Sequence, residues 1–192
     1  MRRLLTPPLL SDEKRYEYHL AAPIENKELM NHVMTSCQNN SLRMNNVSGA
    51  MIVAQMDELS DRVDHWNAMG EVIMKGLEPV SDLIVVPKGE KGAGECFDHC
   101  VFSTPTFNQE QRDFFTKECK VLGVDVKPFG TVENARFFKN WKFLNDIPDM
   151  PKTENIVRHA FDMKVPFTFT ASDWEHISAI MCEVARKTDA LN

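Results

Sequence analysis

The sequence lacks any apolar run close to the roughly 20 residues that a membrane-spanning helix needs. Its first ten residues, MRRLLTPPLL, start with basic residues, but two prolines interrupt a short apolar part, so we expect no secretory signal. It also lacks internal repeats and low-complexity tracts. These absences predict a globular, cytoplasmic protein without a membrane partner.

Positive charge and cysteine are also in short supply. The chain has 22 basic and 28 acidic residues, which give a net charge of -6. We therefore expect no extended basic face for binding nucleic acid. There are five cysteines, an odd number, so a complete disulfide framework would leave one thiol unpaired. Free thiols in a reducing compartment are the simpler expectation.

Catalytic signatures are missing as well. No nucleophile elbow or Ser-His-Asp motif occurs. The stretch KGEKGAGE is no phosphate-binding loop, because a strand rather than a helix is expected after it. Whether the protein is an enzyme therefore stays open, and no cofactor is predicted.

Hydrophobic residues make up 43% of the chain, enough for the core of a single domain over 1–192, with a subdomain boundary near 145–152 at the proline-marked stretch NDIPDMPK. Alternating or apolar runs predict strands at 16–23, 49–56, 82–87, 96–104, 124–128 and 165–170. Helical spacing and capping residues predict helices at 26–40, 57–76, 108–123, 131–144 and 154–163, and a last helix that opens with a capping box of Ser172 and Glu175.

This order predicts an α/β fold: a mixed sheet with helices on both faces, including one βαβ unit at about 101–128. An α+β arrangement is the alternative. The strands at 82–87 and 96–104 are joined by a loop alone, so we expect them to pair as an antiparallel hairpin.

The stretch GECFDHC, residues 94–100, holds the densest group of reactive side chains. On a strand, Cys96 and Cys100 would lie about 13 Å apart, at about 3.3 Å per residue, and His99 would point to the opposite face. A zinc site needs ligands that converge on one ion. We therefore predict no metal site, and only a turn at 95–100 would bring these three residues together.

The βαβ unit offers another candidate site, since ligands bind outside the carboxyl ends of parallel strands. The edge formed by Ser103–Asn108 and Lys127–Thr131 leads into two helix N-termini, which favour phosphate or carboxylate. Helix capping alone explains Asn108 and Thr131 equally well. The candidate ligand-binding residues on this edge are Ser103, Thr104, Thr106, Lys127, Gly130 and Thr131.

Basic and aromatic residues alternate in ARFFKNWKFL, a pattern that suits a protein-binding patch. The candidate contact residues are Arg136, Phe138, Lys139, Lys142 and Phe143. Together with the missing catalytic signature, this predicts a non-catalytic component that binds another protein or a second copy of itself. Regulation, assembly, or a role as a phage or mobile-element accessory protein would suit its size. The alternative is an enzyme, or a binder of a small phosphate-bearing ligand, that uses the edge above.

Overall fold

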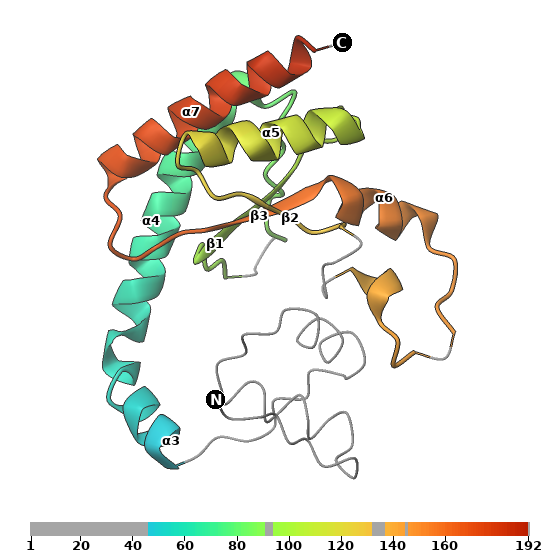
Figure 1. The fold of residues 1–192 in the computed structure, drawn as a ribbon. Coiled ribbons are helices and arrows are strands. Elements are labelled where there is room, and N and C mark those ends of the chain that lie inside the picture. Colours follow the sequence, from blue (N-terminus) through green and yellow to red (C-terminus); the bar gives the residue numbers. More distant parts are fainter. Residues whose placement is uncertain (1–45, 91–93, 132–136, 145, 192) are drawn as a thin grey trace, which may run out of the picture.

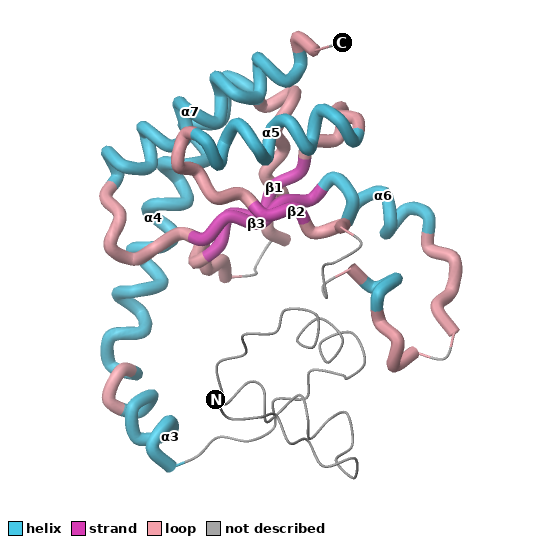
Figure 2. The backbone as a smooth tube through the Cα atoms, in the orientation of Figure 1, coloured by secondary structure: helices cyan, strands magenta, loops and turns pink. Residues whose placement is uncertain are grey.

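A computed structural model describes residues 46–90, 94–131, 137–144 and 146–191 (Figures 1 and 2). The strand expected at 16–23, the helix expected at 26–40 and the candidate contact residue Arg136 lie outside these ranges.

Three strands form the sheet, in the order β1-β3-β2. They are β1 (His99–Ser103), β2 (Lys127–Pro128) and β3 (Ala160–Lys164), and β3 pairs antiparallel with both of its neighbours. Strands β1 and β2 therefore run parallel to each other, as the predicted βαβ unit requires, but β3 lies between them. Val85 forms an antiparallel bridge to Ser103, which confirms the expected pairing of 82–87 with β1.

The long helices are α4 (Leu59–Leu77), α5 (Gln109–Val121) and α7 (Ala171–Asp189). Figure 2 shows α5 and α7 on one side of the sheet, while α4 runs past the end of the sheet and packs against α7. Phe102 and Phe161, stacked with ring centroids 5.3 Å apart, pack against Phe115 of α5. The α/β class is thus confirmed, with two differences in detail: neighbouring strands are antiparallel, and α5 and α7 lie on the same side of the sheet.

Alternation along the strands gives the sheet a core face and a polar face. Cys100 and Phe102 of β1 are buried, and their register partners Met163 and Phe161 are buried beside them. Asp162, between those two, pairs in register with Val101 and Lys127 on the opposite face.

Helix α5 begins and ends where the sequence predicts. Asn108 caps it through a capping box with Gln111, and Gly123, with φ +88°, follows its end in the left-handed region that favours glycine. Helix α7 also has a capping box, but Thr170 and Asp173 form it rather than the predicted Ser172 and Glu175.

Other predicted elements were wrong. The apolar run at 49–56 is not a strand but part of α3 (Asn46–Val53), followed by the 3-10 turn η1 (Met56–Glu58). Helix α6 covers Pro151–His159, and the chain turns into β3 where we expected the helix to continue and a later strand at 165–170. A helix is also expected at 131–144, but its described residues contain only the short 3-10 helix η3 (Phe138–Asn140). A second short 3-10 helix, η2 (Glu78–Val80), follows directly after α4.

Within the described ranges, no helix has both the length and the apolar character that crossing a bilayer demands.

Candidate functional site

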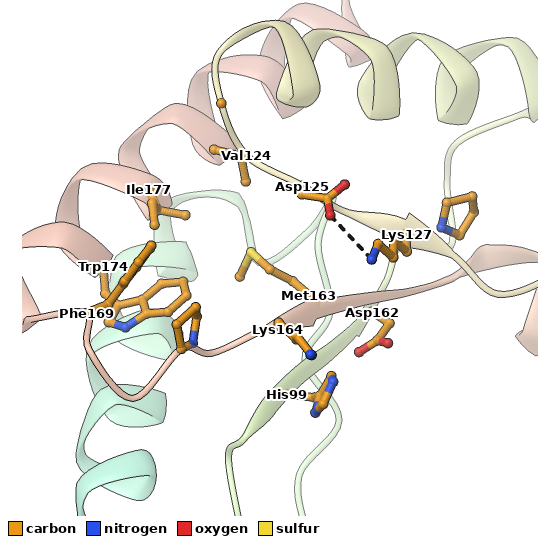
Figure 3. A pocket seen from close by; sticks show the side chains of 13 residues that line it. His99, Val124, Asp125, Lys127, Asp162, Met163, Lys164, Phe169, Trp174 and Ile177 are labelled. Atoms are coloured by element: carbon orange, nitrogen blue, oxygen red, sulfur yellow. Dashed lines mark ion pairs between the residues drawn. The ribbon is translucent and has the colours of Figure 1, made fainter. Parts of the chain in front are cut away.

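A pocket of about 420 Å³ opens where β2 separates from β3, beside the start of α7 (Figure 3). Pairing between these strands begins at Lys127 and Asp162, and the preceding residues 123–125 border the pocket instead. The left-handed turn at Gly123 directs the chain from α5 into this border. The gap follows from the shortness of β2, which holds only two residues.

One wall of the pocket is apolar. Trp174 lies at the first turn of α7 with 1% of its surface exposed, and its ring is 5.4 Å from that of Phe169. Met163 of β3 and Ile177 of α7 continue this wall (Figure 3). The indole Nε1 of Trp174 is buried without a hydrogen-bond partner among the described residues, an arrangement that costs about 1–3 kcal/mol.

The opposite side of the pocket is polar, with charges of both signs. Lys127 Nζ lies 3.4 Å from an Asp125 carboxylate oxygen, and both side chains are about two-thirds exposed. An ion pair this exposed contributes about 0–1 kcal/mol, so a ligand can displace it at little cost. Lys164 and Asp162 complete a set of two lysines and two aspartates.

His99 joins the polar side from β1. Its Nδ1 lies 3.0 Å from an Asp98 carboxylate oxygen, a contact that orients the ring. The arrangement offers carboxylate acceptors and lysine donors opposite an aromatic wall. Such a pocket suits a small polar molecule with one apolar face.

The structure separates the candidate ligand-binding residues that were predicted at the edge formed by Ser103–Asn108 and Lys127–Thr131. Lys127 lines the pocket, whereas Ser103, Thr104, Thr106, Gly130 and Thr131 are not among its lining residues. The α6–β3 junction packs between the two strand ends: the Thr104 N–H donates to His159 and the Phe129 N–H donates to Ala160. Thr104 is fully buried, and its hydroxyl has no partner among the described residues.

Gly130 shows how closely this junction is packed. A Cβ at Gly130 would lie 2.5 Å from the Arg158 Cα. Thr131 contributes its carbonyl oxygen to the Asn140 side chain, 3.2 Å away.

The predicted contact residues are also separated. Phe138 is buried at 6% exposure, and Lys139 forms an ion pair with Glu154, which also binds Arg158. Phe143 stacks on Trp141 with centroids 5.6 Å apart, and Lys142 lies between these two rings in the sequence. The segment therefore packs partly inward and partly on itself, because turns replace the expected regular helix.

The cysteines near β1 lie in different environments. Cys96 is exposed, whereas Cys100 is fully buried on the core face, so with His99 on the polar face they do not form a ligand set. Within the described part of the chain, no group of three or more His, Cys, Asp or Glu side chains could hold a metal ion. Burial raises the pKa of Cys100 to about 12, with a smaller contribution from the Asp162 carboxylate, so this thiol is a poor nucleophile.

Sequence reasoning missed most of the pocket. The helix expected at 154–163 includes Asp162 and ends before Lys164, and no pattern in the expected last helix marks Trp174 as a site residue. Alternation of Phe161, Asp162 and Met163 between apolar and polar was the available signal for β3.

No protein-family model and no curated protein matches this chain. Its fold does match solved structures. A protein assigned as a sugar aminotransferase of Streptococcus pneumoniae, in its PMP form, aligns with a TM-score of 0.63 at 12% identity over 88% of this chain and 46% of its own.

Two further structures show the same relation. A 3-amino-5-hydroxybenzoic acid synthase aligns with a TM-score of 0.59 at 13% identity, over 86% of this chain and 49% of its own. A DegT DnrJ EryC1 StrS aminotransferase of Brucella abortus aligns with a TM-score of 0.55 at 13% identity, over 81% and 43%. This chain thus spans about half the length of each of these structures.

The comparison corrects the prediction of a non-catalytic regulatory or phage accessory component. The described fold recurs within chains named as enzymes, and nothing in it favours an accessory role. This chain thus shares its fold with about half of each of these three chains.

Proposed function

We propose that the chain is the substrate-binding part of an aminotransferase-type enzyme, and that it holds a sugar-like substrate in the pocket between β2, β3 and α7. The observation that carries this proposal is the fold shared with three enzyme chains over 81–88% of the present one. One of those proteins is named as a sugar aminotransferase.

The pocket chemistry supports a polyhydroxy ligand. Sugar hydroxyls both donate and accept hydrogen bonds, which matches aspartate acceptors beside lysine donors. The C–H face of a sugar ring can pack on Phe169, which is 37% exposed and lies against the buried Trp174.

The phosphate group of PMP fits this pocket less well. A phosphate dianion needs an excess of converging donors. Here Lys127 and Lys164 are balanced by Asp125 and Asp162, and Thr170 already caps the nearby start of α7. We therefore assign no chemistry of that cofactor to the described residues of this pocket.

A phosphate-bearing ligand is the second and weaker candidate: the charge balance of the pocket disfavours it, but Lys127 belongs both to the pocket and to the edge predicted from sequence. The α6–β3 junction separates this lysine from Ser103, Thr104 and Thr106. An anion bound at Lys127 could therefore contact those three residues only after the junction had moved. The four free cysteines described here suit work in a reducing compartment such as the cytoplasm.

Thermal unfolding of the purified chain with added ligand tests the proposal. Glucose, glucose 6-phosphate, inorganic phosphate and PMP are the four probes. A ligand at 100 times its Kd should stabilise the chain by about 2.7 kcal/mol, a shift of several degrees in Tm. Glucose and its phosphate should shift Tm if the sugar is recognised, and phosphate alone should do so only if the second candidate is correct.

Substitutions in the pocket provide the matched comparison. Asp125→Ala and Lys164→Ala should abolish the shift while leaving the Tm of the free protein nearly unchanged. Lys187→Ala removes an exposed lysine of α7 outside the pocket and should retain the shift. If no probe shifts Tm, or if the pocket variants respond as Lys187→Ala does, the pocket is not the substrate site.

A further inference from the structure

Residues 165–169 connect β3 to α7, and two of them belong to the wall of the pocket. Pro166 and Phe169 both line it, whereas Phe167 and Thr168 are not among its lining residues. The Phe169 N–H donates to the Pro166 carbonyl oxygen at 3.1 Å, which closes a β-turn with Phe167 and Thr168 at its tip. We call these four residues the pocket turn. Its two ends face the pocket, and its tip lies outside.

The tip of the pocket turn packs against α4. The ring centroid of Phe167 lies 4.5 Å from that of His65 and 5.8 Å from that of Trp66. The guanidinium carbon of Arg62 lies 5.7 Å from the Phe167 centroid, within the range of a cation–π contact. Arg62, His65 and Trp66 are three and four positions apart, so they project from one side of the helix. Phe167 is 47% exposed and fills no part of the core, so what its ring provides is this attachment to α4.

The chain on either side of the pocket turn is held by other contacts. The Val165 N–H donates to the Asp98 carbonyl oxygen at 2.9 Å, and Trp66 Nε1 donates to the Val165 carbonyl oxygen at 3.0 Å. After the turn, Thr170 forms the N-cap of α7. Between these two fixed points, Phe167 is the residue that attaches the turn to α4.

We propose that Phe167 is a positioning residue of the pocket: by anchoring the pocket turn on α4, it holds Phe169 where a ligand packs against that ring. The role in ligand binding rests on the function proposed above, whereas the anchoring is a property of the ligand-free chain. Without the anchor the turn would leave its place in the wall for part of the time. A ligand would then bind only the fraction of molecules in which the wall is formed, and its apparent affinity would fall by that fraction.

Amide hydrogen exchange in the ligand-free chain, followed by NMR, tests the anchoring. Phe167→Ala should speed exchange of the Phe169 N–H about two- to tenfold, the factor that corresponds to one lost aromatic contact. The amides of α5 and α7 should keep their rates, because a general loss of stability would speed exchange throughout the fold. Phe167→Tyr keeps the ring and should leave exchange at Phe169 unchanged.

Two further variants show whether the anchor acts through α4. His65→Ala should also speed exchange at Phe169, and combining it with Phe167→Ala should add nothing, since the contact is already lost. Phe143→Ala is the matched control: it removes a ring that stacks on Trp141 outside the pocket, and it should leave exchange at Phe169 unchanged.

Isothermal titration calorimetry with glucose tests the consequence for the pocket. Phe167→Ala should raise the Kd for glucose about two- to tenfold, and Phe143→Ala should leave it unchanged. Unchanged exchange at Phe169 in Phe167→Ala, or an unchanged Kd for glucose, would overturn the proposal. If glucose does not bind the wild-type chain, the function proposed above fails, and the exchange rates still decide whether Phe167 anchors the turn.

Discussion

Gly76 and Ser178 lie where α4 and α7 pack against each other. A Cβ at position 76 would lie 2.5 Å from the Cβ of Ser178, and the Cys182 thiol donates to the Gly76 carbonyl oxygen at 3.3 Å. We expect Gly76→Ala to lower the free energy of unfolding by about 1–3 kcal/mol, since overpacking outweighs the helix propensity of alanine. Urea unfolding monitored by circular dichroism measures this loss.

Ser178 is the matching partner in this test. Its hydroxyl is buried without a hydrogen-bond partner among the described residues, so Ser178→Ala should be neutral or slightly stabilising. Ser178→Gly combined with Gly76→Ala should recover part of the lost stability. If Gly76→Ala alone stabilises the protein, the two helices are not packed as described.

The buried thiols give a pH prediction. Burial raises the pKa of Cys100 and of Cys119 from 9.0 to about 12, so between these values the unfolded chain releases protons that the folded chain retains. The free energy of unfolding should therefore be intact below pH 9 and fall as pH rises toward 12. Urea titrations over this range, with the Cys100→Ala variant showing a shallower fall, measure the effect.

Alkylation checks the same environments by a second route. Iodoacetamide at pH 8 should modify the exposed Cys96 and leave Cys100 and Cys119 unmodified until the protein unfolds. Rapid modification of Cys100 in the folded protein would contradict its placement in the core.

At the scale of single elements, the cap of α5 can be tested directly. The Asn108 side-chain oxygen accepts a hydrogen bond from the Gln111 N–H, and the Gln111 side-chain oxygen accepts one from the Asn108 N–H. The Gln111 side-chain NH₂ also donates to the Thr188 carbonyl oxygen of α7. Asn108→Ala should cost about 0.5–2 kcal/mol. Asn108→Asp keeps an acceptor and should cost less, and the difference in Tm between the two variants measures the cap.

Helices could be predicted from the sequence where the helical spacing of apolar residues continues over several turns and the ends carry capping residues, as α4 and α5 show. Two short apolar elements could not. The run around Met51 is equally compatible with a buried strand or a helix, because it has no polar face to reveal its period. Strand β3 follows α6 without an intervening loop, so the sequence has no turn signal to separate Phe161 from the helical pattern before it.

The candidate site was predictable only in part, for a related reason. Lys127 could be placed at the end of a strand that follows a helix, and it does line the pocket. Asp162 and Lys164 come from the strand that the sequence did not reveal. Trp174 belongs to a different helix, so its position beside them depends on tertiary packing that no local pattern encodes.

At the scale of the whole molecule, Phe161 connects the sheet to the helices. It is fully buried, stacks on Phe102 and meets Phe115 edge to face at 5.8 Å. We expect Phe161→Ala to cost about 3–5 kcal/mol through lost contacts and the cavity left behind. Ile156→Ala, at a side chain 65% exposed on α6, should cost far less, and chemical denaturation of both variants compares them.

The position of β3 at the centre of the sheet has a consequence for the order in which the molecule assembles during synthesis. Its pairs with β1 join residues 57 to 65 positions apart, from Ser103 with Ala160 to His99 with Lys164, and β1 and β2 share no direct pairing. Both outer strands must therefore leave the ribosome with unsatisfied edges and wait for β3. Long-range closure of this kind is slow, and nascent chains stalled before Ala160 would be the species most prone to aggregate or to need a chaperone.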